Sequence, residues 1–242
     1  MSIEDFKNSI NNLNKKLDAY YSGFAEESFD KTVDGKKHTI PYKRYIRDGL
    51  VNVNQYFFSK IKILWILKEP RDLPGNRGGG WSIVDNINEK RSERIDHYDP
   101  HPTFDPIIQI SYGILNGFIS IEQMPILKNN PQMCKILKSI GYMNVQKMPA
   151  GSLSNDRDIA SAYIRDKLML FQQINTFDPN IIIFGTGTRT NNLISKDMNL
   201  INNYTNKHLH FVYHPSYHKS QAERNSYVNR IIDKAKACHF KS

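Results

Sequence analysis

Residues 61–67 form a short strand-like segment whose centre, Ile63-Leu-Trp-Ile-Leu67, consists entirely of aliphatic and aromatic residues. A strand that faces water on one side alternates apolar and polar residues, whereas a strand covered on both faces is apolar throughout. Strands of the second kind belong to parallel sheets with helices on both sides. This segment therefore predicts an α/β protein with a parallel sheet at its centre.

The rest of the chain supplies further strands in alternation with helices. We expect strands at residues 142–147, 180–184 and 210–213, and helices at residues 104–118, 131–139, 155–174, 188–193 and 222–237. Cap residues such as Asn155 indicate helix starts, and Gly141 indicates a helix end. Strands separated by helices predict a three-layer α/β/α sandwich around a four-stranded, mainly parallel sheet.

Residues 1–58 are expected to form an N-terminal helical segment that packs on a core domain of residues 59–242. Apolar residues at helical spacing predict a helix over residues 3–22. Residues 28–42 are polar and are expected to form a loop. The amphipathic residues 43–58 are expected to form a second helix.

The 242-residue chain carries a formal net charge of +9. This charge suits a polyanionic partner such as nucleic acid, because binding releases phosphate counterions, although basic cytosolic proteins without such a partner share it. No apolar run approaches the roughly 20 residues that span a bilayer, and the N-terminus does not resemble a signal peptide. Cys134 and Cys238 are too few for a cysteine-ligated metal cluster. We expect a monomeric cytoplasmic protein with reduced thiols, no bound metal and no membrane contact.

Polar residues at the ends of three expected strands are the candidates for chemistry. Glu69 follows the first strand, Asn144 follows Gly141-Tyr-Met, and His214 follows the last strand. Ligands of open parallel sheets bind outside the carboxyl ends of the strands, so the three side chains are expected to share a pocket. A carboxylate orients or activates water, an amide reads a base edge, and an imidazole donates a hydrogen bond to a developing anion. Trp81 offers a flat surface for stacking.

Taken singly, these features have simpler explanations. A strand-end Asn or Glu is more often a cap or turn residue, and an isolated His-Pro is more often part of a loop. Gly185-Thr-Gly-Thr188 follows a strand as a dinucleotide-binding loop does, but it lacks the third glycine. His208, His210 and His218 lie near His214, but no Cys or acidic cluster completes a metal site, so surface histidines are the favoured interpretation.

In combination, the motifs resemble those of the uracil-DNA glycosylase superfamily. Lys68-Glu-Pro-Arg-Asp-Leu-Pro-Gly-Asn-Arg-Gly-Gly-Gly-Trp-Ser82 is similar to the family's water-activating loop, in which an acidic residue precedes proline and an aromatic residue precedes serine. Met143-Asn-Val-Gln-Lys147 is similar to the strand end whose Asn reads the uracil edge, and His214-Pro-Ser216 is similar to the family's His-Pro-Ser loop. The motifs follow the family's order, with Asp178-Pro-Asn-Ile-Ile-Ile-Phe-Gly185 as the third core strand. The resemblance covers about residues 61–237.

The resemblance implies a uracil-DNA glycosylase-like domain and a monofunctional DNA glycosylase. Such an enzyme flips uracil or a modified pyrimidine out of DNA and hydrolyses its N-glycosidic bond without a cofactor. The implied catalytic residues are Glu69, which positions water, and His214, which donates to the departing base. The implied base-binding residues are Asn144, Trp81, Pro70 and Arg71. The implied DNA-binding residues are Pro215, Ser216, Tyr217, His218 and Lys219, with Tyr217 or His218 filling the vacated base stack.

Departures from the family pattern bear on specificity. Arg71 stands where the main uracil enzymes have a tyrosine that blocks a C5 methyl group. The resemblance therefore does not imply that thymine is excluded. A contact of Arg71 with phosphate or with a polar base modification stays open. Glu69 is one methylene longer than the family's usual Asp, and the insertion at residues 86–102 has no counterpart in the family. Two other functions stay open: a module that binds DNA or a partner protein without cutting, and a hydrolase of free nucleosides or nucleotides.

Overall fold

The structure is a computed structural model that describes residues 1–24, 26–33, 36–43, 45–72, 78–89, 99–149, 155–200, 208–217 and 220–239. Side chains are described for all of these residues except 26–33, 36–43 and 199–200.

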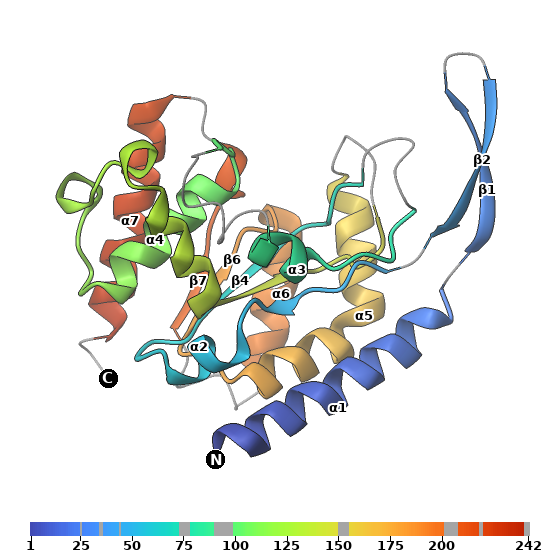
Figure 1. Ribbon diagram of the computed structural model, residues 1–242, viewed down its shortest axis with the longest axis horizontal. Helices are drawn as coiled ribbons and strands as arrows, with labels where there is room; N and C mark the ends of the chain where they lie inside the picture. The colour runs from blue at the N-terminus through green and yellow to red at the C-terminus, as the bar shows by residue number, and fades with distance from the viewer. Residues whose placement is uncertain are drawn as a thin grey trace.

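A five-stranded sheet forms the centre of the fold (Figure 1). Its strands, in spatial order, are β3 (Gly49–Leu50), β5 (Ile140–Asn144), β4 (Ile63–Leu67), β6 (Ile181–Phe184) and β7 (His208–Phe211). The last four are parallel, and β3 runs antiparallel to β5. All four strands expected from the sequence are present, but the expected count of four is wrong because β3 adds a fifth.

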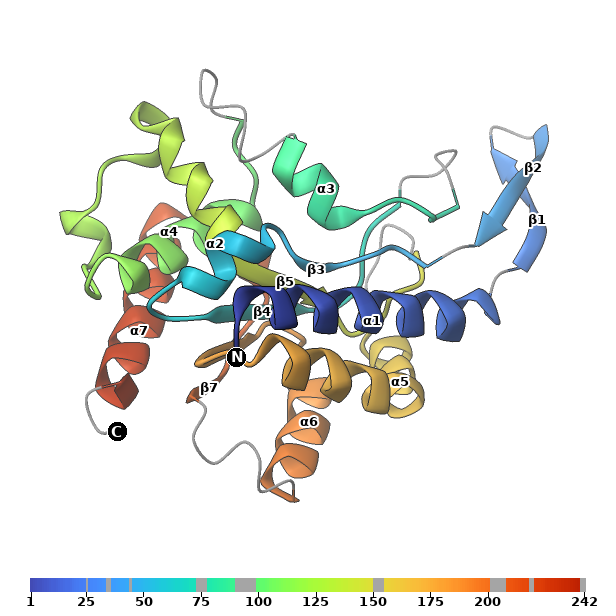
Figure 2. The ribbon, with the colours of Figure 1, turned by 60° about the horizontal axis from the view of Figure 1, so that its bottom comes forward.

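Helices cover both faces of the sheet, which explains why β4 is apolar at every position. On the first face, Ile63, Trp65 and Leu67 pack in one core with α3 (Ile83–Ile87), α4 (Phe104–Leu115), α7 (Gln221–His239) and the 3-10 helix η4 (Pro131–Ser139). On the second face, Leu64 and Ile66 pack with α1 (Ile3–Ser22), α2 (Val53–Phe58), α5 (Asp156–Phe177) and α6 (Thr188–Leu200). Figure 2 shows α1 lying along α5 on this second face. The expected α/β sandwich is therefore confirmed.

The helix expected at residues 3–22 is confirmed as α1. Ser2 caps it, because the Ser2 hydroxyl accepts from the backbone N–H of Asp5, and the Asp5 carboxylate accepts from the backbone N–H of Ser2. The segment expected as a helix at 131–139 is the 3-10 helix η4, and three shorter 3-10 helices, η2 (Ile121–Gln123), η3 (Leu127–Asn129) and η6 (Pro215–Tyr217), lie in connecting segments. Within the described part of the chain, no helix combines the length and the apolar character that a membrane span requires.

The loop expected at residues 28–42 is wrong for residues 28–33 and 36–42, which belong to a β-hairpin. Strands β1 (Glu26–Val33) and β2 (Lys36–Lys43) pair antiparallel, with Thr32 opposite Lys37. In Figure 1 the hairpin extends away from the rest of the fold, beyond the end of α1. In the sequence, the dipeptide Asp34-Gly35 stands between the two strands, and Asp-Gly is a common hairpin signal.

Residues 43–58 are likewise not one helix. Residues 45–48 are not helical, and Arg47 forms an isolated parallel bridge with Ser82. Strand β3 follows, and α2 begins only after Asn52, whose side chain accepts from the backbone N–H of Gln55. Gly49 has φ of +141°, a value that residues with a side chain rarely adopt, so the helix expected across it is wrong. This turn brings Asp48 to the end of β5, where its carboxylate accepts from the backbone N–H of Asn144.

Gly113 of α4 offers a test of the packing between α4 and α7. A Cβ at this position would lie 2.5 Å from Ile232 Cδ1 and 2.8 Å from the backbone oxygen of Ile119, which cannot move aside cheaply. Gly113→Ala is therefore expected to lower the free energy of unfolding by at least about 1 kcal/mol, although alanine favours helices by about the same amount. Urea unfolding measures the change. Gly23→Ala is the matched control, because its Cβ would meet nothing closer than 3.6 Å, and unchanged stability of the Gly113 variant would contradict the packing described.

Candidate active site

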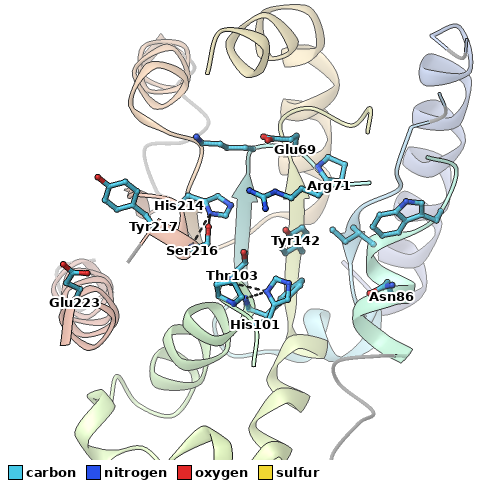
Figure 3. Close-up of a pocket in the computed structure, with 16 residues that line it drawn as sticks. Glu69, Arg71, Asn86, His101, Thr103, Tyr142, His214, Ser216, Tyr217 and Glu223 are labelled. Atoms are coloured by element: carbon cyan, nitrogen blue, oxygen red, sulfur yellow. Dashed lines mark hydrogen bonds between the residues drawn. The ribbon is translucent and has the colours of Figure 1, made fainter. Parts of the chain in front are cut away.

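A cavity of about 940 Å³ opens at the carboxyl ends of the central strands, between the loop after β4 and the segment after β7. Its lining residues are Lys68, Glu69, Pro70, Arg71, Trp81, Ile83, Asn86, His101, Pro102, Thr103, Phe104, Tyr142, His214, Ser216, Tyr217 and Glu223. In Figure 3, Arg71 and His214 point toward one another across the cavity, and His101 and Thr103 lie at its opposite end beyond Tyr142. Segments far apart in the sequence thus meet at one edge of the sheet.

Most residues that the resemblance assigns to the site line this cavity, namely Glu69, Pro70, Arg71, Trp81, His214, Ser216 and Tyr217. Pro215 is buried beneath them and its ring packs against Gly185. Asn144 is buried and is not among the residues that line the cavity. His218 and Lys219 lie outside the described residues.

His214 is held as a neutral imidazole with its proton on Nε2. The backbone N–H of Ser216 donates to Nδ1 over 3.3 Å, and the Ser216 hydroxyl lies 2.8 Å from the same atom. An Nδ1 that accepts a backbone hydrogen bond carries no proton, which assigns the proton to Nε2. Burial, together with the positive charges of Lys68 and Arg71, lowers the pKa of His214 to about 4. At neutral pH the ring therefore supplies an uncharged N–H donor.

Asn144 ends β5 on the face of the sheet that carries the cavity. Ile140 and Tyr142 pack on the first face and Met143 on the second, so strand alternation places Asn144 on the first face with Tyr142. The residue is only 1% exposed, and neither its Oδ1 nor its Nδ2 has a hydrogen-bond partner among the described residues. A buried unsatisfied polar group costs about 1–3 kcal/mol, and such groups concentrate where a ligand or an ordered water completes them.

Two hydrogen bonds anchor the described parts of the loop after β4. Lys68 Nζ donates to Asp156 at the start of α5 over 2.8 Å, and the backbone N–H of Gly79 donates to Asp72 over 2.7 Å. The glycines from Gly78 to Gly80 have φ of +52°, +81° and +75°, which only glycine adopts readily. These glycines form a defined turn that leads into Trp81.

Trp81 is fixed by pairing with the extended segment before β3. The backbone N–H of Arg47 donates to the Trp81 carbonyl over 3.0 Å, and the N–H of Ile83 donates to the Arg47 carbonyl over 2.8 Å. The indole is half-buried and packs against the core of the first face while lining the cavity. It is therefore a rigid apolar wall, as stacking on a planar ring requires.

Sequence reasoning missed the part of the cavity formed by the start of α4 and by β5. The backbone N–H groups of Thr103 and Phe104 donate to His101 Nδ1 over 3.2 and 3.3 Å, so this imidazole caps the helix. The signal in the sequence is His101-Pro102 shortly before Asp105-Pro106, at the end of the insertion at residues 86–102. Tyr142 lies in the apolar strand β5, and the sequence pattern of a strand does not distinguish a residue that lines a cavity from one in the core. Its pKa is raised by burial and by the nearby Asp48 and Glu69 carboxylates.

Two of the four histidines near the end of the last strand, His208 and His210, lie on β7. Among the residues that the structure describes, no group of three or more His, Cys, Asp or Glu side chains is arranged to hold a metal ion. The surface position expected for His210 is wrong, because this residue is only 5% exposed. Burial, with the charges of His208 and Lys234, lowers the pKa of His210 to about 4.

The neutral state of His214 predicts an unusual titration. Because its pKa in the folded protein lies below the ordinary value of 6.5, the ring is expected to take up a proton only as the pH falls to about 4. The unfolded chain binds that proton first, so the stability that His214 contributes is present above pH 6.5 and is lost as the pH falls toward 4. Ring NMR shifts of His214 across pH 3–8 measure the midpoint, with Ser216→Ala testing the contribution of the hydroxyl. A midpoint near 6.5 would contradict the assigned state.

The cavity is lined by a neutral imidazole donor, a carboxylate and an aromatic wall, with Lys68 and Arg71 adding positive charge. The amide of Asn144, without a partner among the described residues, is buried at the end of β5 on the same face of the sheet. These groups can bind a planar heterocycle, stabilise negative charge on it and position water. The sequence matches no protein-family model and no curated protein.

Proposed function

We propose that this protein is a monofunctional DNA glycosylase with a uracil-DNA glycosylase-like fold, which excises uracil or a modified pyrimidine from DNA. The observation that carries the proposal is His214, a neutral imidazole whose Nδ1 is occupied by Ser216 and whose remaining proton is on Nε2. A neutral donor suits a leaving group that departs as an anion, because it stabilises the charge without first protonating the base.

The amide of Asn144 supports a planar, hydrogen-bonding ligand. Its side chain has one acceptor and two donors, and it has no partner among the described residues. A pyrimidine edge presents donors and acceptors side by side, so it satisfies the amide that the fold leaves unpaired. Trp81, half-buried and fixed by Arg47, supplies the stacking surface for the same ring.

In the proposed reaction, the nucleotide leaves the duplex and the base enters the cavity. The N-glycosidic bond then breaks with its electron pair moving to the base, which leaves the sugar as a cation. His214 Nε2–H donates to the base oxygen that gains negative charge, and the Glu69 carboxylate stabilises the sugar cation and positions water. Water adds to the sugar carbon and loses a proton to solvent, and the base takes up a proton after release.

Tyr217 supports an encounter with duplex DNA. Its ring is 67% exposed and stacks on Tyr213, which is 53% exposed, with centroids 5.2 Å apart. The backbone N–H of Tyr217 donates to the His214 carbonyl over 2.9 Å, so the exposed ring is tied to the catalytic loop. An exposed aromatic ring at this position suits insertion into the base stack that a flipped nucleotide leaves.

Arg71 supports a pocket that is not restricted to uracil. Its side chain faces His214 across the cavity, where the main uracil enzymes place a blocking tyrosine (Figure 3). The cavity, at about 940 Å³, is at the upper end of the usual range for small-molecule sites. A base that carries a polar substituent is therefore compatible with both its size and its charge.

The direct test is incubation with single-stranded and duplex oligonucleotides that carry uracil, 5-hydroxymethyluracil, hypoxanthine or modified cytosines, followed by alkali cleavage. Abasic product from at least one pyrimidine is expected. Salt-dependent DNA binding without abasic product would instead favour a binding module. Release of base from free nucleotides without DNA binding would favour a nucleotide hydrolase.

Removing the donor or the amide is expected to disable excision without unfolding the protein. His214→Ala and Asn144→Ala should each lower single-turnover excision by about 100- to 1,000-fold, the usual loss for one donor of a preorganised site. Circular dichroism checks folding, and the exposed Ile164→Ala on α5 is a control that is expected to keep full activity. Near-normal excision by the His214 variant would show that the site is misplaced.

Tyr217→Ala separates base flipping from bond cleavage. If Tyr217 fills the vacated stack, the variant should lose at least about tenfold more activity on duplex than on single-stranded DNA, because a single strand has little stacking to replace. Tyr213→Ala, which removes the stacking partner, should have a smaller effect of the same kind. Equal losses on both substrates would argue against insertion.

A further inference from the structure

A buried polar cluster lies behind the end of β5, on the side of the strand away from the cavity. The Asp48 carboxylate accepts from Lys147 Nζ over 2.7 and 2.8 Å, from Gln173 Nε2 over 3.1 Å, and from the backbone N–H of Asn144 over 2.7 Å. All four residues are buried, with at most 4% exposure. The cluster joins the segment before β3, the end of β5 and helix α5.

At the end of β5, the Asp48 side chain accepts the backbone hydrogen bond that a neighbouring strand would otherwise accept. Strand β3 pairs with β5 only at Gly49–Tyr142 and Leu50–Gly141, so its backbone turns away before reaching Asn144. The carboxylate of Asp48 accepts the N–H that the edge of the sheet would otherwise leave unpaired. On the other side, the N–H of Val145 donates to the Leu67 carbonyl over 2.9 Å. The backbone around Asn144 is thus held from both sides.

Lys147 extends the same restraint beyond the strand. Its carbonyl accepts from the backbone N–H of Ile46 over 2.8 Å, while its ammonium group binds Asp48. Burial lowers the pKa of Lys147, and the Asp48 carboxylate opposes that change. A buried ion pair of this kind adds little stability over an apolar pair, so a role in orientation explains its presence better than stability does.

We propose that Asp48, supported by Lys147 and Gln173, is a positioning residue that fixes the Asn144 side chain for recognition of the base. The proposal rests on the proposed function of Asn144 and extends it to groups that do not touch the substrate. Asp48 acts through the backbone of Asn144, and the orientation of the unpaired amide follows from it. A displacement of a positioned group by about 1 Å costs about 100-fold in rate.

Two double variants separate the hydrogen bond from the charges. Asp48→Leu with Lys147→Met removes both charges and the acceptor for Asn144 N–H. Asp48→Asn with Lys147→Met also removes both charges, but it keeps an amide oxygen as acceptor and brings an N–H that Gln173 Oε1, unpartnered among the described residues, can accept. Neither variant leaves a single buried charge, the change most apt to prevent folding.

Steady-state excision kinetics give the first readout. The Asp48→Leu double variant is expected to lose about 100-fold in kcat with KM for DNA within about twofold, whereas the Asp48→Asn double variant should stay within about threefold of the parent. Lys167→Gln with Asp197→Asn, which removes an ion pair between α5 and α6, is the control and should leave kcat unchanged. Equal activity of the two Asp48 variants, whether both high or both low, would overturn the proposal.

NMR of the free protein gives a readout that does not depend on excision. The side-chain amide signals of Asn144 should shift or broaden in the Asp48→Leu double variant and stay in place in the Asp48→Asn double variant. An unchanged Asn144 signal in the Leu variant would overturn the positioning role. If the parent protein excises no base, the proposed function fails, and these signals still decide whether Asp48 orients Asn144.

Discussion

Burial of β4 on both faces is the constraint on which the rest of the structure depends. Trp65 and its neighbours on one face pack against α4 and α7, while Leu64 and Ile66 pack against α1 and α5. A strand enclosed in this way is typical of parallel sheets, and parallel strands end at the same edge of the sheet. The cavity lies at that edge because the residues that follow β4 and β7, together with Tyr142 of β5, meet there.

The polar groups at this edge differ in protonation and in hydrogen bonding from the same groups in water. Burial and neighbouring positive charges keep His214 neutral, and the amide of Asn144 is enclosed without a partner among the described residues. Asp48 accepts hydrogen bonds from the backbone N–H of Asn144 and from Lys147, and these bonds hold the backbone at the end of β5. In the proposed reaction, this preorganisation lets one donor act on the departing base while Glu69 faces the sugar.

The apolar runs were enough to predict the parallel strands, because burial on two faces leaves a local pattern. The same reasoning missed β3 and assigned a helix across Gly49, since its two-residue pairing with β5 has no local pattern. Glu69, Trp81 and His214 were recognised from motifs that stand next to strands, and they line the cavity. Asp48 and His101 were not recognised, because no motif marks them. Asp48 binds the backbone of Asn144, which is far from it in the sequence, and His101 caps a helix whose start it precedes.

The most direct measurement is a crystal structure of the protein with duplex DNA that contains 2′-fluoro-2′-deoxyuridine, an analogue whose glycosidic bond resists cleavage. The account predicts that the uracil ring is extrahelical, lies in the cavity against Trp81, and accepts a hydrogen bond from His214 Nε2 while its edge meets the Asn144 amide. A base that stays stacked in the duplex, or DNA bound away from the carboxyl ends of β4 and β7, would contradict it.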